Sequence, residues 1–205
     1  MNEQNEPAGA LPPANPEIEP SAEQQRESLA PRVYVASLSD YNAGRLHGQW
    51  IDAAQEPEEI HADIASMLSE SRESGAEEWA IHDFEGFGPL RLSEYESPEY
   101  VTAVARGIVE HGQAFAAWAA LVDGDRQSLG GFSDSYLGEW ESVEAYAESM
   151  LDDLGIEEEL DRVVPAWVRP YVQLDTEAFA RDIVLGGDVS SAESPSGAVW
   201  LFDRL

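Results

Sequence analysis

Residues 32–51 carry the first regular pattern of apolar and polar positions along the chain. Arg32–Ser37 and Arg45–Ile51 are rich in β-branched and aromatic side chains at partly alternating positions, which predicts two neighbouring strands. Asp40–Gly44 between them has the residue types of a turn, although it is too long for a tight hairpin. We therefore expect two paired strands joined by a longer turn.

A helical period follows these strands. The helix is expected to begin near Pro57, with Glu58–Glu59 in its first turn, where the helix dipole favours acids, and Gly75 is expected to end the unit. Its apolar positions are Ile60, Ile64, Met67 and Leu68. Glu78–Asp83 predicts a third strand. Residues 32–92 are thus predicted to form a small ββαβ module.

The next segment is predicted to be helical. Ser97 is a capping residue and Pro98 suits the first helical position. The buried stripe of this helix is expected to be Tyr100, Val101, Val104 and Ile108, and His111–Gly112 is expected to end it. A second short helix carries Phe115, Trp118 and Val122 and is expected to end at Asp123–Gly124.

The C-terminal part contains patterns typical of both helices and strands. Gly131–Trp140 is predicted to be extended, and the clearest amphipathic helix of the chain follows, with apolar positions at Val143, Tyr146, Ala147, Met150, Leu151 and Leu154. Pro165 and Pro170 interrupt the region after it. Asp175 is expected to cap a further helix that runs to Gly186–Gly187, and Ala198–Phe202 predicts a closing strand.

These patterns predict an α+β fold made of small sequential modules. Residues 1–31 have no aromatic residue and hold six of the twelve prolines, which predicts a disordered, acidic, Pro-rich tail. The predicted domains are an N-terminal α+β module at 32–92, a helical middle module at 93–130 and a C-terminal α+β module at 131–205. We find no internal repeat.

The charge excludes several classes of function. The chain has 41 Asp and Glu against 11 Lys and Arg, and all eleven cations are Arg, so the formal net charge is −30. Phosphate groups would repel such a chain, which argues against direct binding to nucleic acid or to anionic lipid. Leu, Ile, Val and Phe still total 45 of 205 residues, enough for a core. The absence of Cys, of a signal peptide and of a long apolar run predicts a soluble cytoplasmic protein.

The sequence offers little catalytic chemistry. Its four histidines are scattered, and there is no phosphate-binding loop, dinucleotide fingerprint or nucleophile elbow. The segment that begins at Asp123 does not match the EF-hand calcium-binding loop, because its sixth position is Ser128 rather than Gly and its twelfth is Asp134 rather than Glu. We expect the protein to have no cofactor, no metal ion and no enzymatic activity. A hydrolase that uses two of the many carboxylates stays open as an alternative.

The acids are therefore the feature to explain. Those on the clearest helix lie opposite its apolar stripe, and there is no Lys or Arg between Arg126 and Arg162 to relieve their repulsion. A solvated face, salt adaptation and a functional negative surface all fit this pattern. Without the tail the net charge is −25, which at the charge density of duplex DNA corresponds to about 43 Å of duplex. Only an elongated body could display it in that way.

Six ordered segments resemble the ArdA antirestriction family: Val33–Gly44 (VYVASLSDYNAG), Gly48–Asp52 (GQWID), Glu78–Phe87 (EWAIHDFEGF), Glu110–Trp118 (EHGQAFAAW), Tyr136–Ser142 (YLGEWES) and Glu177–Asp182 (EAFARD). The resemblance covers nearly all of residues 32–205. It implies an elongated, three-domain, usually dimeric DNA mimic that occupies the DNA-binding groove of type I restriction–modification enzymes. The tail and the complete absence of Lys depart from the family pattern.

The resemblance also implies which residues matter. Six positions that match the family pattern are interpreted as core and turn residues, not catalytic ones: Trp50, Trp79, His82, Phe84, Gly86 and Phe115. The expected partner-binding carboxylates are Glu58, Glu59, Asp63, Glu70, Glu73, Glu77, Glu94, Glu96, Glu99, Glu141, Glu144, Glu148, Asp152, Asp153, Glu157, Glu158 and Glu159. A non-catalytic acidic adaptor of another DNA-binding protein is the alternative function.

Overall fold

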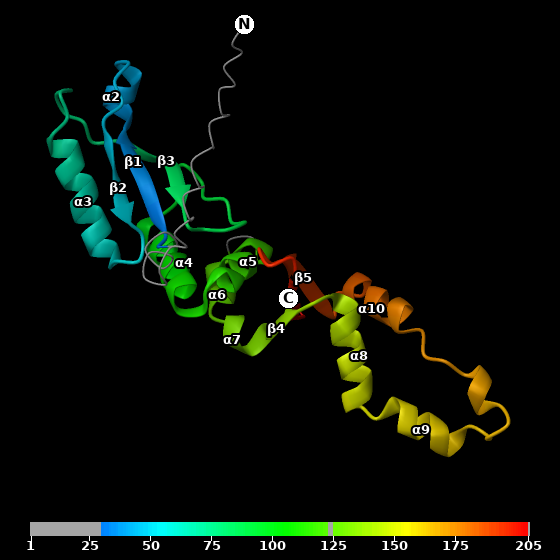
Figure 1. Ribbon diagram of the computed structural model, residues 1–205. Coiled ribbons are helices and arrows are strands. Elements are labelled where there is room, and N and C mark those ends of the chain that lie inside the picture. The colour runs from blue at the N-terminus through cyan, green and yellow to red at the C-terminus, as the bar shows by residue number, and fades with distance from the viewer. Residues whose placement is uncertain (1–29, 123–124, 205) are drawn as a thin grey trace, which may run out of the picture.

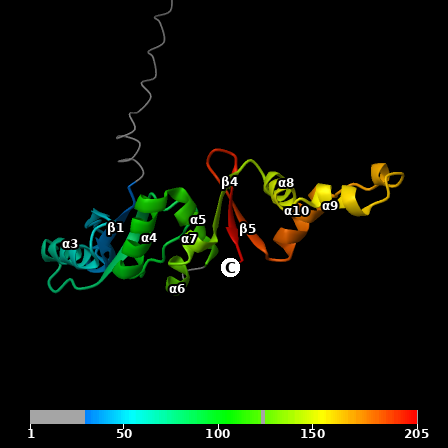
Figure 2. The ribbon, with the colours of Figure 1, turned by 90° about the horizontal axis from the view of Figure 1, so that it is seen from below.

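The computed structural model describes residues 30–122 and 125–204, which form an elongated α+β chain (Figures 1 and 2). The described residues contain nine α-helices and two three-stranded antiparallel sheets. The predicted α+β class is confirmed, while the division into three domains stays a prediction. The expected disorder of the tail falls almost wholly outside the described residues. Pro31 is buried, and its carbonyl accepts a hydrogen bond from the Ala53 N–H (2.9 Å).

The first sheet consists of β1 (Arg32–Ser37), β2 (Gly48–Asp52) and β3 (Trp79–Glu85), in the order β2-β1-β3. All three strands were predicted, although β2 begins three residues later than expected. Gly48 explains this start, because a Cβ there would lie 2.4 Å from the Val35 carbonyl oxygen across the strand pair. Only glycine allows β1 and β2 to approach so closely at this point.

The expected turn at 40–44 is wrong in part, since the chain forms a short helix, α2 (Leu38–Asn42), before it turns. The side chain of Ser37 caps this helix by accepting a hydrogen bond from the Asp40 N–H (3.3 Å). Gly44 then reverses the chain at a φ of +77°. The serine cap supplies the helix start that the turn-forming residues concealed.

Helix α3 (Pro57–Ser69) packs beside β1 and β2, as its apolar period predicted, and buries Ile60, Ile64 and Met67. Its N-terminus is held by a capping box, in which the Glu59 carboxylate accepts a hydrogen bond from the Glu56 N–H (3.0 Å). The helix ends at Ser69, so the residues up to Gly75 form a loop that leads to β3.

Helices α4 (Pro98–His111) and α5 (Gln113–Leu121) form the middle of the chain. The side chain of Ser97 caps α4, and the predicted stripe of α4 is buried. A Cβ at Gly107 would lie 2.2 Å from the Phe115 ring, so this glycine lets the two helices pack closely. The predicted end of the second helix at 123–124 lies outside the described residues.

The second sheet consists of β4 (Tyr136–Trp140), β5 (Val189–Glu193) and β6 (Val199–Asp203), in the order β4-β6-β5. The extended prediction for 131–140 is wrong in its first half. Helix α7 (Phe132–Ser135) occupies this half and packs Phe132 into the core, and another short helix, α6 (Arg126–Leu129), precedes it. Strand β5 was not predicted, since its sequence VSSAE has only one large apolar residue.

Strand β6 separates two apolar cores by the alternation of its side chains. Trp200 and Phe202 belong to the larger core, which also contains the buried residues of the first sheet, α3, α4 and α5. Leu201, between them in sequence, belongs to a smaller core with Ala147, Ala180 and other residues. Successive residues of a strand point to opposite faces, so β6 serves both cores.

Beyond the second sheet the chain continues as α8 (Val143–Asp153), α9 (Ile156–Val163), the short 3₁₀ helix η1 (Arg169–Tyr171) and α10 (Thr176–Leu185). We name residues 31–122 the proximal body and residues 141–185 the distal arm. The cap of α10 by Asp175 is as predicted, but α9 was not predicted. Gly155, at a φ of +64°, turns the chain between α8 and α9, and the described side chains of α9 are at most half-buried.

Candidate functional site

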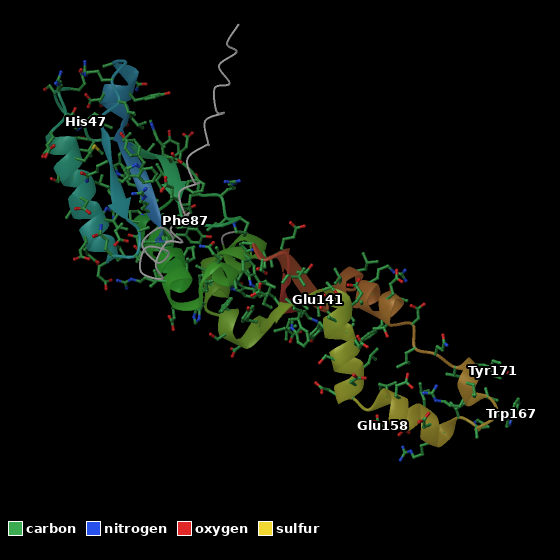
Figure 3. The ribbon with its side chains drawn as sticks, in the orientation of Figure 1. His47, Phe87, Glu141, Glu158, Trp167 and Tyr171 are labelled. Atoms are coloured by element: carbon green, nitrogen blue, oxygen red, sulfur yellow. The ribbon has the colours of Figure 1, made fainter. Side chains whose placement is uncertain are left out.

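The carboxylates expected to bind a partner are mostly exposed. Fourteen of the seventeen are exposed, and Asp63, Glu73 and Glu96 are half-buried. They lie in two groups, one on the proximal body and one on the distal arm (Figures 1 and 3). The exposed members are Glu58, Glu59, Glu70, Glu77, Glu94, Glu99, Glu141, Glu144, Glu148, Asp152, Asp153, Glu157, Glu158 and Glu159.

Some acids of the proximal group stabilise the fold locally. The Glu59 carboxylate belongs to the capping box of α3. The Asp63 carboxylate accepts a hydrogen bond from the Gln55 side chain (2.7 Å). These groups are less available to a partner than an unengaged carboxylate, because a new contact has to compete with an existing one.

Glu73 is part of a larger network around a buried carboxylate. Its side chain pairs with Arg45, whose Nε also lies 3.4 Å from Asp40. Asp40 is only 1% exposed and accepts a hydrogen bond from the Ser71 hydroxyl. That hydrogen bond, helped by Ser37 and Arg45, lowers the pKa of Asp40 against the opposing effect of burial. The network fastens the loop between α3 and β3 to α2.

Glu77, Glu96 and Glu99 converge on one groove, together with Glu78, which sequence reasoning did not include. This open groove has a volume of about 650 Å³ and is also lined by Leu38, His61, Trp79, Tyr95, Ser97 and Pro98. His61 Nε2 lies 3.6 Å from the Glu99 carboxylate. The backbone N–H of Glu99 and the side chain of Ser97 lower the pKa of Glu99.

Five acids of the distal group accompany α8, and all are exposed. Glu141 lies just before the helix, as Figure 3 shows, and the others are Glu144, Glu148, Asp152 and Asp153. The backbone N–H of Glu144 and the Ser142 side chain lower the pKa of Glu144. Within the described residues, none of these five carboxylates forms an ion pair with an arginine or histidine.

The three consecutive acids on α9 differ from one another. Glu157 pairs with Arg169, and Glu159 pairs with Arg162. Arg169 also binds Asp161 (2.6 Å) and donates a hydrogen bond to the Val172 carbonyl (2.8 Å), so it ties the segment after α9 back to the helix. Glu158, labelled in Figure 3, is exposed and forms no such pair among the described contacts. Glu158 is therefore the most available acid of the three.

Most arginines are occupied by acids of the same chain. In the part of the chain that the structure describes, seven arginines pair with carboxylates: Arg32, Arg45, Arg106, Arg162, Arg169, Arg181 and Arg204. Because these cations are engaged, the remaining carboxylates face solvent with little local compensation. The arrangement can attract a cationic surface.

The positions interpreted as core and turn residues divide into two sets. Phe115 is buried, Trp79 and Phe84 are half-buried, and Gly86 turns the chain at a φ of +83°. Trp50 and His82 are exposed, so the interpretation is wrong for these two. Trp50 pairs with Tyr34 on the outer face of the sheet, and the Arg32 guanidinium lies 4.7 Å from its ring centroid. His82 packs edge-on against Tyr41.

The described residues hold no group of three or more His, Cys, Asp or Glu side chains placed to bind a metal ion. None of the described helices combines the length and the apolar character needed to cross a bilayer.

Comparison with known proteins identifies a family. The model of the family described as "Antirestriction protein (ArdA)" matches residues 33–196, which is four fifths of the chain. The match begins within β1 and ends just before β6, so it spans both groups of acids. No curated protein matches the chain.

Proposed function

Since the chain belongs to the ArdA antirestriction protein family, we propose that it inhibits type I restriction–modification enzymes by occupying their DNA-binding groove in place of duplex DNA. In this mechanism the surface carboxylates take the positions of DNA phosphates. The protein acts in the cytoplasm, without catalysis or a cofactor, and binds the enzyme rather than nucleic acid.

One observation carries the proposal: on both the proximal body and the distal arm of an elongated chain, there are exposed carboxylates that form no ion pair with an arginine of the described residues (Figure 2). DNA-binding grooves present arginine and lysine side chains to two strands of phosphates along their length. A compact acidic protein would reach only a short part of such a groove. An elongated protein can place many negatively charged groups along the groove.

The magnitude of the charge agrees with this use. The net charge of −25 outside residues 1–31 equals that of about 43 Å of duplex DNA. Each carboxylate remains largely solvated, so each contact would contribute about 1 kcal/mol or less and many contacts would share the binding energy. Inhibition should then be insensitive to most single acid substitutions.

We further propose that the protein acts as a homodimer joined through the end of the distal arm. Figure 3 labels Trp167 and Tyr171 at this end; they are 81% and 86% exposed, and Leu154 is 64% exposed. Residues 162–174 contain no acid, although one residue in five of the chain is Asp or Glu. Two polyanions repel each other least where both lack acids, which favours a second copy as the partner of this apolar end.

Competition against DNA tests the mechanism. A purified type I enzyme is bound to a fluorescent duplex, and the protein is added at several salt concentrations. We expect stoichiometric displacement at low salt and a steep loss of affinity towards about 0.5 M monovalent salt, since screening weakens phosphate-type contacts. Circular dichroism should show an intact fold throughout.

Two other outcomes would favour different functions. Inhibition that does not change with salt would mean that the negative charge is an adaptation to the environment and not the mechanism of inhibition. Failure to displace DNA, together with strong binding to another DNA-binding protein, would favour the acidic adaptor.

A matched pair of multiple variants measures how the energy is shared. Neutralising six distal acids should weaken displacement far more than any single change: Glu141, Glu144, Glu148, Asp152, Asp153 and Glu158. The control neutralises six exposed acids outside the candidate surface: Asp83, Glu110, Asp134, Glu177, Glu193 and Asp203. Both variants have the same net charge, so equal effects would mean that only the total charge matters.

A further inference from the structure

The groove beside β3 differs from the rest of the acidic surface because it is concave and has aromatic walls. It opens between α3, the first residue of β3 and the loop that leads into α4. With a volume of about 650 Å³, it is large enough to enclose a long side chain. The acids of α8, by contrast, lie on the outer face of a helix.

Two aromatic side chains line this groove beside the aliphatic Leu38 and Pro98. Trp79 is half-buried and is packed against the larger core, so its position is fixed. Tyr95 is 71% exposed, which leaves most of its ring open to solvent and to a ligand. Aromatic rings with open faces attract cations through the negative charge of their π systems.

Carboxylates complete the lining. Glu77, Glu78, Glu96 and Glu99 contribute four acids, and none of the described residues that line the groove is an arginine. Hydrogen bonds from its own N–H and from Ser97 keep Glu99 ionised, as the lowered pKa of Glu99 indicates. The groove therefore combines rings that stack on a flat cation with oxygens that accept its hydrogen bonds.

We propose that this groove receives one arginine side chain of the restriction enzyme. The inference rests on the proposed function and adds a discrete anchoring site to an otherwise distributed interface. Arginine fits better than lysine, because its planar guanidinium stacks on Tyr95 while its N–H groups reach two carboxylates at once. A guanidinium seated against the exposed Tyr95 ring would displace water from that face, which strengthens both contacts.

A small-molecule probe tests the groove without any partner. Methylguanidinium is titrated into the protein at constant ionic strength, and the indole N–H signals of the tryptophans are followed by NMR. We expect a saturable shift of the Trp79 signal and only small, linear shifts of Trp118 and Trp140. Methylammonium should bind at least about threefold more weakly, since it cannot stack or form paired hydrogen bonds.

Variants of the full chain locate the binding. Tyr95→Ala and Glu77→Gln should each abolish saturation of the Trp79 signal. Asp83→Asn is the matched control, because Asp83 is an exposed acid of β3 that does not line the groove, and the substitution removes the same charge as Glu77→Gln. Saturation that survives in Tyr95→Ala, or equal binding of methylammonium, would overturn the arginine assignment.

The displacement assay then connects the groove to inhibition. Tyr95→Ala should raise the concentration needed to displace DNA about tenfold, whereas Asp83→Asn should raise it less than about twofold. If the unmodified protein displaces DNA and Tyr95→Ala does so equally well, the anchoring site is wrong and the mimicry stands. If the unmodified protein does not displace DNA, the proposed function fails, whatever the probe shows.

Discussion

The proximal body and the distal arm use the same kind of amphipathic helix but bury it to different extents. Helix α4 buries eight residues, among them the whole of its predicted stripe. Helix α8 has an equally regular stripe in the sequence, yet only Ala147 is buried, and Leu154 at its end is largely exposed. A regular apolar period therefore shows which face of a helix is available for burial, and the neighbours decide how much of it is covered.

The neighbours differ for a topological reason. Helix α4 meets α3 and α5 and contributes to the core that includes the first sheet. Helix α8 packs on α10 and touches α9 and β4, while α9 packs mainly on α8. Among the described residues, no further layer covers the second side of the distal arm. In our proposal a second copy of the chain supplies that layer.

The acids of the two regions also differ in how many of them are engaged in contacts within the fold. In the proximal body, Asp40 and Glu73 share Arg45, and Asp63 and Glu59 are engaged in hydrogen bonds of the fold. On α8 the acids face solvent. The proximal body therefore offers fewer free charges but a shaped groove, and the distal arm offers an open row of charge.

The largest expected effect concerns stability and is measured by making the same substitution, Met→Ala, once in each region. Met67 on α3 is 3% exposed, whereas Met150 occupies an equivalent stripe position on α8 and is only half-buried. Met67→Ala should lower the free energy of unfolding by about 2–5 kcal/mol, and Met150→Ala should lower it by about 1 kcal/mol or less. Urea unfolding measures both. Equal losses would mean that the distal stripe is covered in solution.

The second prediction concerns self-association of the distal arm. Trp167→Asp should raise the dissociation constant of the dimer at least about 100-fold, because it places a charge in an apolar contact between two anionic chains. Sedimentation velocity over a dilution series measures the change. Tyr41→Asp is the control, since Tyr41 is also exposed but lies on the proximal body. A dimer that tolerates Trp167→Asp would place the interface elsewhere.

The third prediction tests the buried carboxylate of the proximal body. Asp40→Asn removes the charge that Arg45 and Ser71 stabilise and should lower Tm by about 5 °C at pH 7. Because folding lowers the pKa of Asp40, its charge stabilises the fold above the ordinary pKa of 3.8, and this contribution is lost as the pH falls through the lower, folded value.

The difference in Tm between the unmodified protein and Asp40→Asn should therefore be constant above about pH 5 and shrink below about pH 4. Thermal scans of both proteins from pH 3 to pH 7 provide the comparison, with Glu94→Gln as the control for a surface acid. A difference that grows as the pH falls would contradict this role of Asp40.

The smallest effects should distinguish neighbouring acids on α9. Glu157→Gln breaks a pair with Arg169 and should lower Tm slightly, whereas Glu158→Gln relieves repulsion and should raise it by about 1 °C or less. In the displacement assay Glu158→Gln should weaken displacement more than Glu157→Gln, since Glu158 is the more available of the two acids. Calorimetry and displacement on the same two variants check both statements, and identical behaviour would show that the Arg169 pair is not formed in solution.

Local sequence signals determined much of this fold. The caps at Ser97 and Asp175, the proline at position 57 and the apolar periods of α3 and α4 predicted helices α3, α4 and α10 correctly, because each signal acts within a few residues. The continuous apolar run of β6 predicted a strand, and tertiary structure explains why the run is continuous, since β6 faces a core on each side. The family resemblance also followed from short ordered segments alone.

Only the tertiary structure decided which side chains are covered and which acids are free. The polar sequence of β5 becomes a strand because β6 provides its hydrogen-bonding partner. The exposure of Trp50 and Trp167 depends on which face of the sheet or arm lacks a neighbour. The groove beside β3 joins residues from positions 38, 61, 77–79 and 95–99. Such contacts link segments far apart in the chain, and no local pattern of residues specifies them.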